Sequence, residues 1–333
     1  MIATDELRPR EPLVAGVDVG GTKTSVVVTD DRDRIVYEHV TPTDRSSLVA
    51  QIAGLVDDAQ RELRQDVAAV GVAIPGHVDP EGGSVSMAVN LGITHLPLGA
   101  MLEKELGVPI FVEHDARAAA LWLSEQAADG SDGVPANIAF LAIGTGVSAG
   151  VVLDGALLRG DNGFAGEVGH VVAEPDGAVC ACGLRGCLET IVAGPAIGRQ
   201  ADETMAAGRP TVLSSHASAA DVFRASTAGD EVAVEITDRV ADHLARAIRS
   251  LALTLGVRQI VIGGGVAAAG SALLEPIRSS IARERAASPL VEAALGDATV
   301  QLVSPTEEPA ARGAAAIARH RIGSPERKGV AKR

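Results

Sequence analysis

The sequence predicts an α/β protein of two similar domains that face each other across a central cleft. Three observations lead to this prediction. A chain of 333 residues with 47% apolar side chains is long enough to bury two separate cores. Near its start, the apolar pattern changes from the two-residue period of strands to the spacing of a helix. A short strand–turn–strand pattern then recurs 124 residues further along the chain.

The first part of the chain predicts a sheet with a helix between two of its strands. Apolar runs on either side of a glycine turn predict a tight hairpin, and a third strand would complete a meander. Helical spacing follows. The next apolar run predicts a parallel strand, which that helix connects to the preceding strands as a crossover. The expected strands are 13–19, 25–28, 35–40, 67–74 and 109–112, and the expected helices are 48–63 and one that opens over 116–123.

The second half repeats this pattern. An offset of 124 residues places the turn at Gly20 on the turn at Gly144, which predicts a duplicated α/β unit. The later strands are expected over 259–262 and 299–303, and the later helices over 232–255, 273–284 and 310–320. We expect an N-terminal domain of residues 1–120 plus 310–333, to which the last helix returns, and a larger domain of residues 121–309.

Composition and charge disfavour several classes of partner. The formal net charge of -14 argues against a nucleic-acid surface, which needs clustered Lys and Arg to displace counterions from phosphates. No stretch reaches the roughly 18 apolar residues that a membrane span needs. All three cysteines fall within 180–187, too close together for a secreted disulfide framework, which indicates metal ligation in a reducing compartment. We expect a cytoplasmic protein without nucleic-acid or membrane partners.

The cysteines and one histidine form the most specific local pattern. A Cys₃His set is a common tetrahedral zinc shell, whereas the alternative is three structural thiols beside an unrelated histidine. Four protein ligands leave no open position on the metal, so the expected role of Zn²⁺ is to staple a loop. Glu167 and Glu189 bracket the set, either as solvated acids or as acceptors for substrate hydroxyls. The expected zinc ligands are His170, Cys180, Cys182 and Cys187.

Three glycine turns follow apolar runs. A turn without bulky side chains lets backbone N–H groups approach an anion, and phosphate is the natural guest. An ordinary hairpin is the alternative for the first turn, in a chain with 37 glycines. Three such turns predict a nucleotide held by both domains, with Asp18 holding Mg²⁺ through water. The turns are Asp18-Val19-Gly20-Gly21-Thr22-Lys23, Gly144-Thr145-Gly146 and Gly263-Gly264-Gly265.

Asp115 lies where the predicted strand 109–112 meets the following helix. A carboxylate there could accept the proton of a substrate hydroxyl that attacks phosphorus. The same residue before Ala116 is also a good helix N-cap, and the local sequence favours the cap. Glu113 and His114 are equally ambiguous, because either could be a surface side chain at a strand end.

These motifs together resemble the ROK family of bacterial sugar kinases and sugar-responsive repressors, within the actin-like ATPase superfamily. The resemblance covers nearly the whole chain. The turns at 18–23 and 144–146 look like the two phosphate loops of the family, and 71–76 looks like its sugar-domain turn. The run from Gly163 to Glu189 is similar to the family signature at every diagnostic spacing.

The resemblance implies two RNase H-like domains and an ATP-dependent kinase that phosphorylates a hydroxyl of a hexose or hexose-like substrate, as glucokinase does. It implies ATP and Mg²⁺, a structural Zn²⁺, and a homodimer or homotetramer. Asp115 would be the catalytic base rather than a helix cap, and 263–266 would lie at the adenosine. His170 would use one ring nitrogen for zinc and the other for the sugar. The implied sugar-binding residues are Asn90, His114, Glu167, His170 and Glu189.

One segment departs from the family pattern. Family kinases usually read Glu-Asn-Asp-Ala-Asn where this chain has Glu113-His114-Asp115-Ala116-Arg117. The missing Asn normally contacts sugar hydroxyls, and Arg117 is expected to add a bulky charge nearby. The alternative acceptors are therefore an amino sugar derivative or a C7-cyclitol. A sugar-sensing ROK protein without catalysis is a further alternative.

Overall fold

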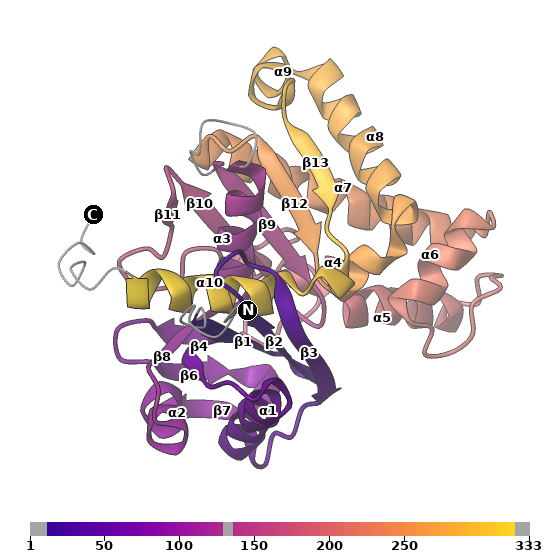
Figure 1. Ribbon diagram of the computed structural model, residues 1–333. Coiled ribbons are helices and arrows are strands. Elements are labelled where there is room, and N and C mark those ends of the chain that lie inside the picture. Colours follow the sequence, from indigo (N-terminus) through magenta and orange to yellow (C-terminus); the bar gives the residue numbers. More distant parts are fainter. Residues whose placement is uncertain (1–11, 129–135, 324–333) are drawn as a thin grey trace, which may run out of the picture. The chain divides into compact units, whose positions relative to one another are not determined.

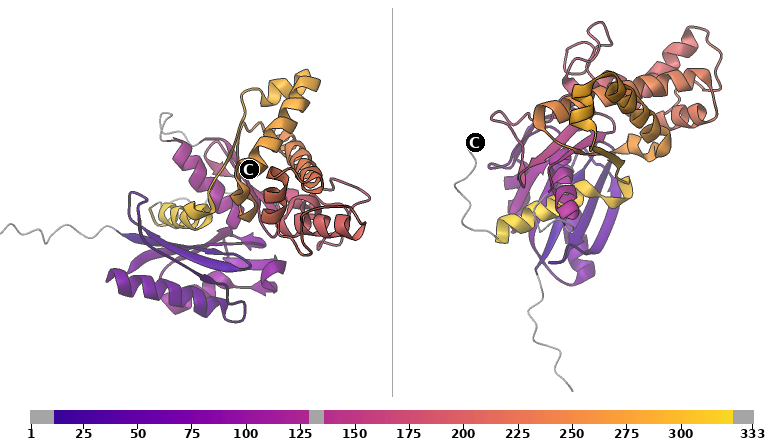
Figure 2. Two further views of the ribbon diagram at one scale, coloured as in Figure 1. Left: turned by 90° about the vertical axis from the view of Figure 1, so that its right-hand side faces the viewer. Right: turned by 90° about the horizontal axis from the view of Figure 1, so that it is seen from above.

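The computed structural model describes residues 12–128 and 136–323, and the chain divides into two compact units (Figures 1 and 2). Unit 1 is discontinuous: it comprises the chain up to Trp122 and the chain from Pro309 onward. Unit 2 is Leu123–Glu308. The first boundary falls within helix α3, Asp115–Ala128, and the second at the start of helix α10, Pro309–Gly323. The ends of the expected first domain, 1–11 and 324–333, lie outside the described residues.

Unit 1 is built on a five-stranded sheet with the order β3-β2-β1-β4-β8. Strand β2 is antiparallel to β1 and β3, whereas β4 is parallel to β1 and to β8. The strands are β1 (Leu13–Val19), β2 (Lys23–Thr29), β3 (Ile35–Pro42), β4 (Val67–Ile74) and β8 (Ile110–His114). The meander and the parallel return strand predicted from the sequence are confirmed.

Helices cover both faces of this sheet, with α1 (Leu48–Leu63) and α2 (Leu98–Leu106) on one face and α10 on the other (Figure 1). Alternate residues of β1 face opposite layers, as the two-residue period of a strand requires. Ala15 and Val17 belong to the core with α1 and α2. Val14 packs with alanines of α10.

Two glycines let α10 lie directly on the strands. Gly16 of β1 and Gly71 of β4 are paired in register. A Cβ atom on Gly16 would lie 1.9 Å from the carbonyl oxygen of Ala311, and one on Gly71 would lie 1.9 Å from that of Ala314. Any larger residue would therefore push the last helix off the sheet.

A small antiparallel sheet follows β4. It is formed by β5 (His77–Asp79), β6 (Ser84–Ala88) and β7 (Ile93–Leu96) in the order β5-β6-β7. The 3₁₀ helix η1 (Val89–Leu91) between β6 and β7 carries Asn90. These strands are too short for a periodic pattern, so sequence analysis did not find them.

Unit 2 repeats the sheet of unit 1. Its order, β11-β10-β9-β12-β13, has the same sequence of antiparallel and parallel pairs. The strands are β9 (Ile138–Ile143), β10 (Val147–Leu153), β11 (Ala156–Leu157), β12 (Gln259–Gly263) and β13 (Thr299–Leu302). The offset of 124 residues found in the sequence moves β2 onto β10. The predicted duplication is therefore present in the topology.

The helices of unit 2 form the larger of the two cores around α7. Asp230 caps α7 by accepting a hydrogen bond from the N–H of Ala233, and Gly256 ends it in a left-handed conformation. No helix within 12–128 and 136–323 is long and apolar enough to span a bilayer. The helices are α4 (Glu189–Val192), α5 (Gly194–Ala206), α6 (Ala219–Thr227), α7 (Glu231–Leu255), α8 (Ser271–Ala287) and α9 (Pro289–Leu295), with 3₁₀ turns η2 (Val168–His170), η3 (Gly265–Ala269) and η4 (Pro305–Glu307).

The close approach of α10 gives a stability prediction. Gly71→Ala should lower the free energy of unfolding by about 1–3 kcal/mol, because the methyl group overlaps the carbonyl of Ala314. Gly54→Ala within α1 is the matched control, since a Cβ there meets nothing within 4 Å and alanine favours a helix. Urea unfolding followed by the fluorescence of the single tryptophan, Trp122, measures both. A Gly71 variant as stable as wild type would contradict this packing.

Candidate functional site

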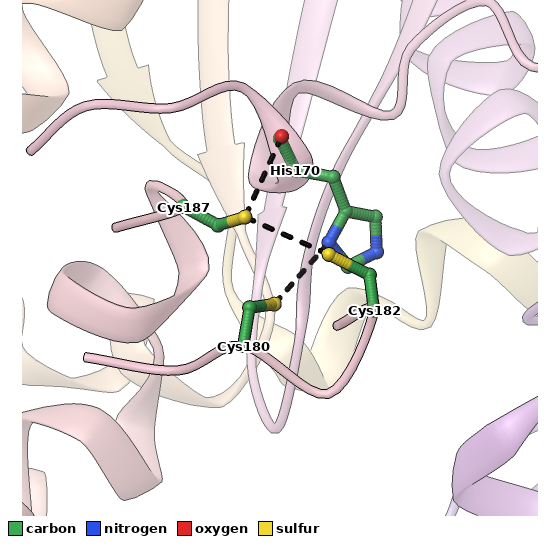
Figure 3. Close-up of side chains that lie close together, drawn as sticks. All are labelled: His170, Cys180, Cys182 and Cys187. Atoms are coloured by element: carbon green, nitrogen blue, oxygen red, sulfur yellow. Dashed lines mark hydrogen bonds between the residues drawn. The ribbon is translucent and has the colours of Figure 1, made fainter. Parts of the chain in front are cut away.

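Four possible metal ligands converge in unit 2, and their side chains point toward one another (Figure 3). His170 ends η2, and the three cysteines follow in an irregular segment that leads to α4. The Sγ atom of Cys180 lies 3.6 Å from Nδ1 of His170, and those of Cys182 and Cys187 lie 3.7 Å apart. All four ligand atoms are within 4.8 Å of one another. We call residues 170–187 the cysteine loop.

The separations of 3.6 and 3.7 Å match those between two ligands of a tetrahedral zinc ion. Zn–S bonds of about 2.3 Å and Zn–N bonds of about 2.0 Å place tetrahedral ligands roughly 3.6–3.8 Å apart. Burial raises the pKa of the Cys187 thiol to about 12 and also raises the pKa of Cys180, whereas a hydrogen bond from the N–H of Leu184 lowers the pKa of Cys182. Thiols with raised pKa values need a nearby cation to become thiolates, and Zn²⁺ would supply that charge.

Backbone contacts close the cysteine loop on itself. Isolated bridges pair Val172 with Cys187 and Val179 with Arg185. Gly186 has a φ of 69°, and a Cβ atom there would lie within bonding distance of the carbonyl oxygen of Glu174. Glycine is therefore required where the two limbs of the loop cross.

Glu189 joins the cysteine loop to the start of β10. One of its carboxylate oxygens, Oε2, accepts a hydrogen bond from the N–H of Val147 at 2.9 Å, and the other lies 3.9 Å from Sγ of Cys180. On the other limb, a Cβ atom on Gly169 would lie 2.1 Å from the carbonyl oxygen of Val147. The residues around Glu167 and those around Glu189 thus meet at the same strand end.

The second and third glycine turns lie side by side in unit 2. The N–H nitrogen of Gly265 is 3.9 Å from the place that a Cβ atom on Gly144 would occupy. The N–H of Gly194, at the start of α5, donates to the carbonyl of Gly144 at 2.8 Å. Sequence analysis missed Gly194, although Pro195 in the first turn of α5 is a typical helix-start signal. The positive end of a helix next to two glycine turns favours an anion.

The first glycine turn, in unit 1, is shaped by residues that sequence analysis also missed. Thr43 donates from Oγ1 to the carbonyl of Gly20 at 2.7 Å, and Arg45 donates to the carbonyl of Gly21 at 2.6 Å. Because these two side chains bind the carbonyls of Gly20 and Gly21, the backbone of the turn is held in one conformation. Asn90 lies beside it, because a Cβ atom on Gly21 would be 3.6 Å from that of Asn90.

Asp115 is the first residue of α3, directly after β8. Its Oδ1 accepts a hydrogen bond from the N–H of Ala116 at 2.6 Å and lies 3.1 Å from Nδ1 of His114. A capping carboxylate would instead bond the second or third N–H of the helix, so the contact with the adjacent N–H is not a standard cap. The Asp115 side chain is 29% exposed, which leaves the carboxylate accessible.

Arg117 brings its charge to this corner, as expected, and that charge is paired with Glu113. Its side chain is 3% exposed, and its Nε donates at 2.8 Å to Oε1 of Glu113, which is 1% exposed. The same oxygen accepts the N–H of His114 at 2.9 Å. Glu113 lies in β8 and Arg117 in α3, so this buried pair spans the strand–helix junction at Asp115 and restrains the backbone there.

The predicted site residues are divided between the two units. Those in unit 1 are Asp18, Gly20, Gly21, Thr22, Lys23, Asn90, His114 and Asp115. Those in unit 2 are Gly144, Thr145, Gly146, Glu167, His170, Cys180, Cys182, Cys187, Glu189, Gly263, Gly264 and Gly265.

A family model described as the ROK family matches residues 14–321. The chain belongs to the ROK family. It is 37% identical over 277 residues to a glucokinase of Halalkalibacterium halodurans, which covers 79% of this chain and 83% of the relative. It is 35% identical over 272 residues to an N-acetylmannosamine kinase of Citrobacter koseri, which covers 81% of this chain and 89% of the relative.

Solved structures agree with this assignment. A ROK family glucokinase from Streptomyces griseus in complex with glucose and AMPPNP superposes with a TM-score of 0.76 at 30% identity, over 92% of this chain and 99% of that one. A ROK family transcriptional regulator superposes with a TM-score of 0.77 at 25% identity, over 91% of this chain and 77% of that one. The predicted family and the actin-like ATPase fold are confirmed.

Substituting one ligand tests the metal site. Cys182 is the exposed cysteine, so Cys182→Ser removes a thiolate with little change in packing. We expect the purified variant to lose its zinc, measured by mass spectrometry of the metal, and its melting temperature to fall by roughly 5–10 °C. Ser214→Ala, at another exposed position of unit 2, is the control. Full zinc content in the Cys182 variant would refute the assigned ligand set.

Proposed function

We propose that this ROK protein transfers the γ-phosphoryl group of ATP to a hydroxyl of a hexose or a hexose-like sugar. The observation that carries the proposal is Asp115, whose accessible carboxylate begins α3 in a chain otherwise similar to sugar kinases along most of its length. Relatives named glucokinase and N-acetylmannosamine kinase support a sugar as the acceptor.

Asp115 is the proposed general base. It accepts the proton of the acceptor hydroxyl as that oxygen attacks the γ-phosphorus. The contact with Nδ1 of His114 and the buried Glu113–Arg117 pair hold the carboxylate in place. Such positioning matters because proton transfer requires a fixed hydrogen-bond distance between base and hydroxyl.

The glycine turns are the proposed nucleotide contacts. Backbone N–H groups of 20–23 and 144–146 would hold the phosphates, and 263–265 would contact the adenosine. The start of α5 beside Gly144 adds the favourable field of a helix N-terminus. Bound Mg²⁺ would neutralise charge on the phosphates, and Asp18 is the carboxylate that we assign to its water ligands.

The proposed sugar contacts are Asn90, His114, Glu167, His170 and Glu189. With Nδ1 of His170 on the metal side, its Nε2 carries the proton and can donate to a sugar oxygen. Glu189 uses Oε2 for the N–H of Val147 and retains acceptor sites for hydroxyl groups. The cysteine loop and the residues that flank it on both sides would thus present hydrogen-bonding groups for a polyol.

A sugar-sensing protein without catalysis is the second candidate. The likeness to a ROK transcriptional regulator favours it, and the presence of Asp115 argues against it. The cytoplasmic location, the absence of a nucleic-acid or membrane partner, the Mg²⁺ ion and the homodimer or homotetramer remain predictions.

Turnover tests the proposal. The purified protein with Mg-ATP should release ADP with at least one acceptor among glucose, N-acetylmannosamine, other hexoses and cyclitols. Asp115→Asn should lower kcat by roughly 10²–10⁴-fold, as expected for loss of a general base, while calorimetry still detects sugar binding. Asp31→Asn at an exposed turn is the control. Release of ADP with none of the acceptors would favour the sensing alternative.

His114 tests acceptor preference. His114→Asn restores the residue usual in the family, with both a donor and an acceptor on one amide. We expect the ratio of kcat/KM for glucose to that for N-acetylmannosamine to rise by up to about tenfold, the effect of roughly one hydrogen bond. Steady-state kinetics with both sugars measure it. An unchanged ratio would show that His114 does not set the choice between them.

A further inference from the structure

Outside the metal ligands, one charged cluster holds the cysteine loop against the helices of unit 2. Arg239 of α7 donates to both carboxylate oxygens of Glu174, from Nε at 3.1 Å and from Nη2 at 2.5 Å. His243, one turn further along α7 and 5% exposed, lies 2.8 Å from Oε1 of the same carboxylate. Two side chains of the long helix α7, one face of which is buried, therefore hold Glu174 in place.

The same guanidinium is also linked, through Gln200, to the helix that follows the loop. Nη1 of Arg239 donates at 2.7 Å to Oε1 of Gln200 in α5. The Gln200 amide nitrogen in turn donates at 2.8 Å to the carbonyl of Ile191 in α4, the helix that begins with Glu189. Gln200 is 4% exposed and its bond to Ile191 is buried, whereas the bond from Arg239 is partly buried. One arginine thus connects the incoming limb of the loop with the helix that follows it.

The backbone carries this restraint to the metal ligands. The N–H of Glu174 donates to the carbonyl of Gly186 at 3.0 Å, directly before Cys187. The hydrogen bond from Arg239 lowers the pKa of Glu174, which keeps the carboxylate ionised at neutral pH. A displacement of Glu174 would therefore move the crossing of the two limbs.

We infer that Arg239 is a positioning residue for the sugar, which holds the Glu167–His170 limb and Glu189 at a fixed separation. This inference rests on the proposed kinase function. Arg239 contacts neither the metal ligands nor, in our assignment, the sugar, and it acts through Glu174 and Gln200. A planar guanidinium can satisfy both partners at once, which a lysine ammonium cannot do with the same geometry.

The test compares Arg239→Lys and Arg239→Gln with wild type in sugar and ATP titrations. We expect the KM for the sugar to rise about tenfold, with kcat within about threefold, and with zinc content and the KM for ATP unchanged. Glu174→Gln should give the same pattern. A double variant at Arg239 and Glu174 should raise the KM for the sugar no more than either single variant does. Arg209→Lys is the control, because Arg209 makes a bidentate pair with Glu235 of the same helix, at 2.5 and 2.8 Å.

Three results would overturn the inference. They are a wild-type sugar KM in both Arg239 variants, equal losses for sugar and ATP, and loss of zinc that accounts for the change. If wild type phosphorylates no acceptor, the kinase proposal fails, and calorimetric affinity for glucose and N-acetylmannosamine then decides the role of Arg239. Equal affinity of wild type and the variants, or no binding by either, overturns it.

Discussion

The convergence of His170 with three cysteines is the constraint on which the rest of the unit 2 site depends. The cysteine loop contains almost no regular helix or strand, and only turns and isolated bridges connect its two limbs through the backbone. A tetrahedral ion at this site would add four directional bonds to these contacts. Because Gly169 and Glu189 both contact Val147, the same constraint also sets the distance between the loop and the glycine turn that precedes β10.

A second set of restraints acts from the helical side. Arg239 and His243 hold Glu174, and Gln200 passes the connection on to α4. The loop is thus held by its own backbone contacts and by a charged cluster, and a bound metal ion would restrain it further. Such restraint suits the proposed role in sugar binding, which requires carboxylates and an imidazole at fixed positions. In unit 1, the buried Glu113–Arg117 pair restrains the backbone ahead of Asp115 in a comparable way.

Sequence analysis succeeded where the signal is local or periodic. The apolar spacing of α7, the 124-residue offset between the two sheets and the crowding of cysteines each lie within one segment or one simple repeat. It failed where the partner is distant in the chain. Arg45 follows Gly21 by 24 residues and Arg239 follows Glu174 by 65, so only the folded chain shows these contacts. At Asp115, the local sequence is the same whether the residue is a helix cap or a catalytic base. Only the folded chain shows that its carboxylate bonds the adjacent N–H.

The central claim is that the metal-stapled loop is itself a sugar-binding element. A crystal structure with glucose or N-acetylmannosamine and AMPPNP, with anomalous data collected at the zinc edge, tests it most directly. The account predicts an anomalous peak between Nδ1 of His170 and the three sulfurs, with sugar oxygens on Nε2 of His170 and on the Glu167 and Glu189 carboxylates. A metal at that position with the sugar bound away from these three residues would contradict it.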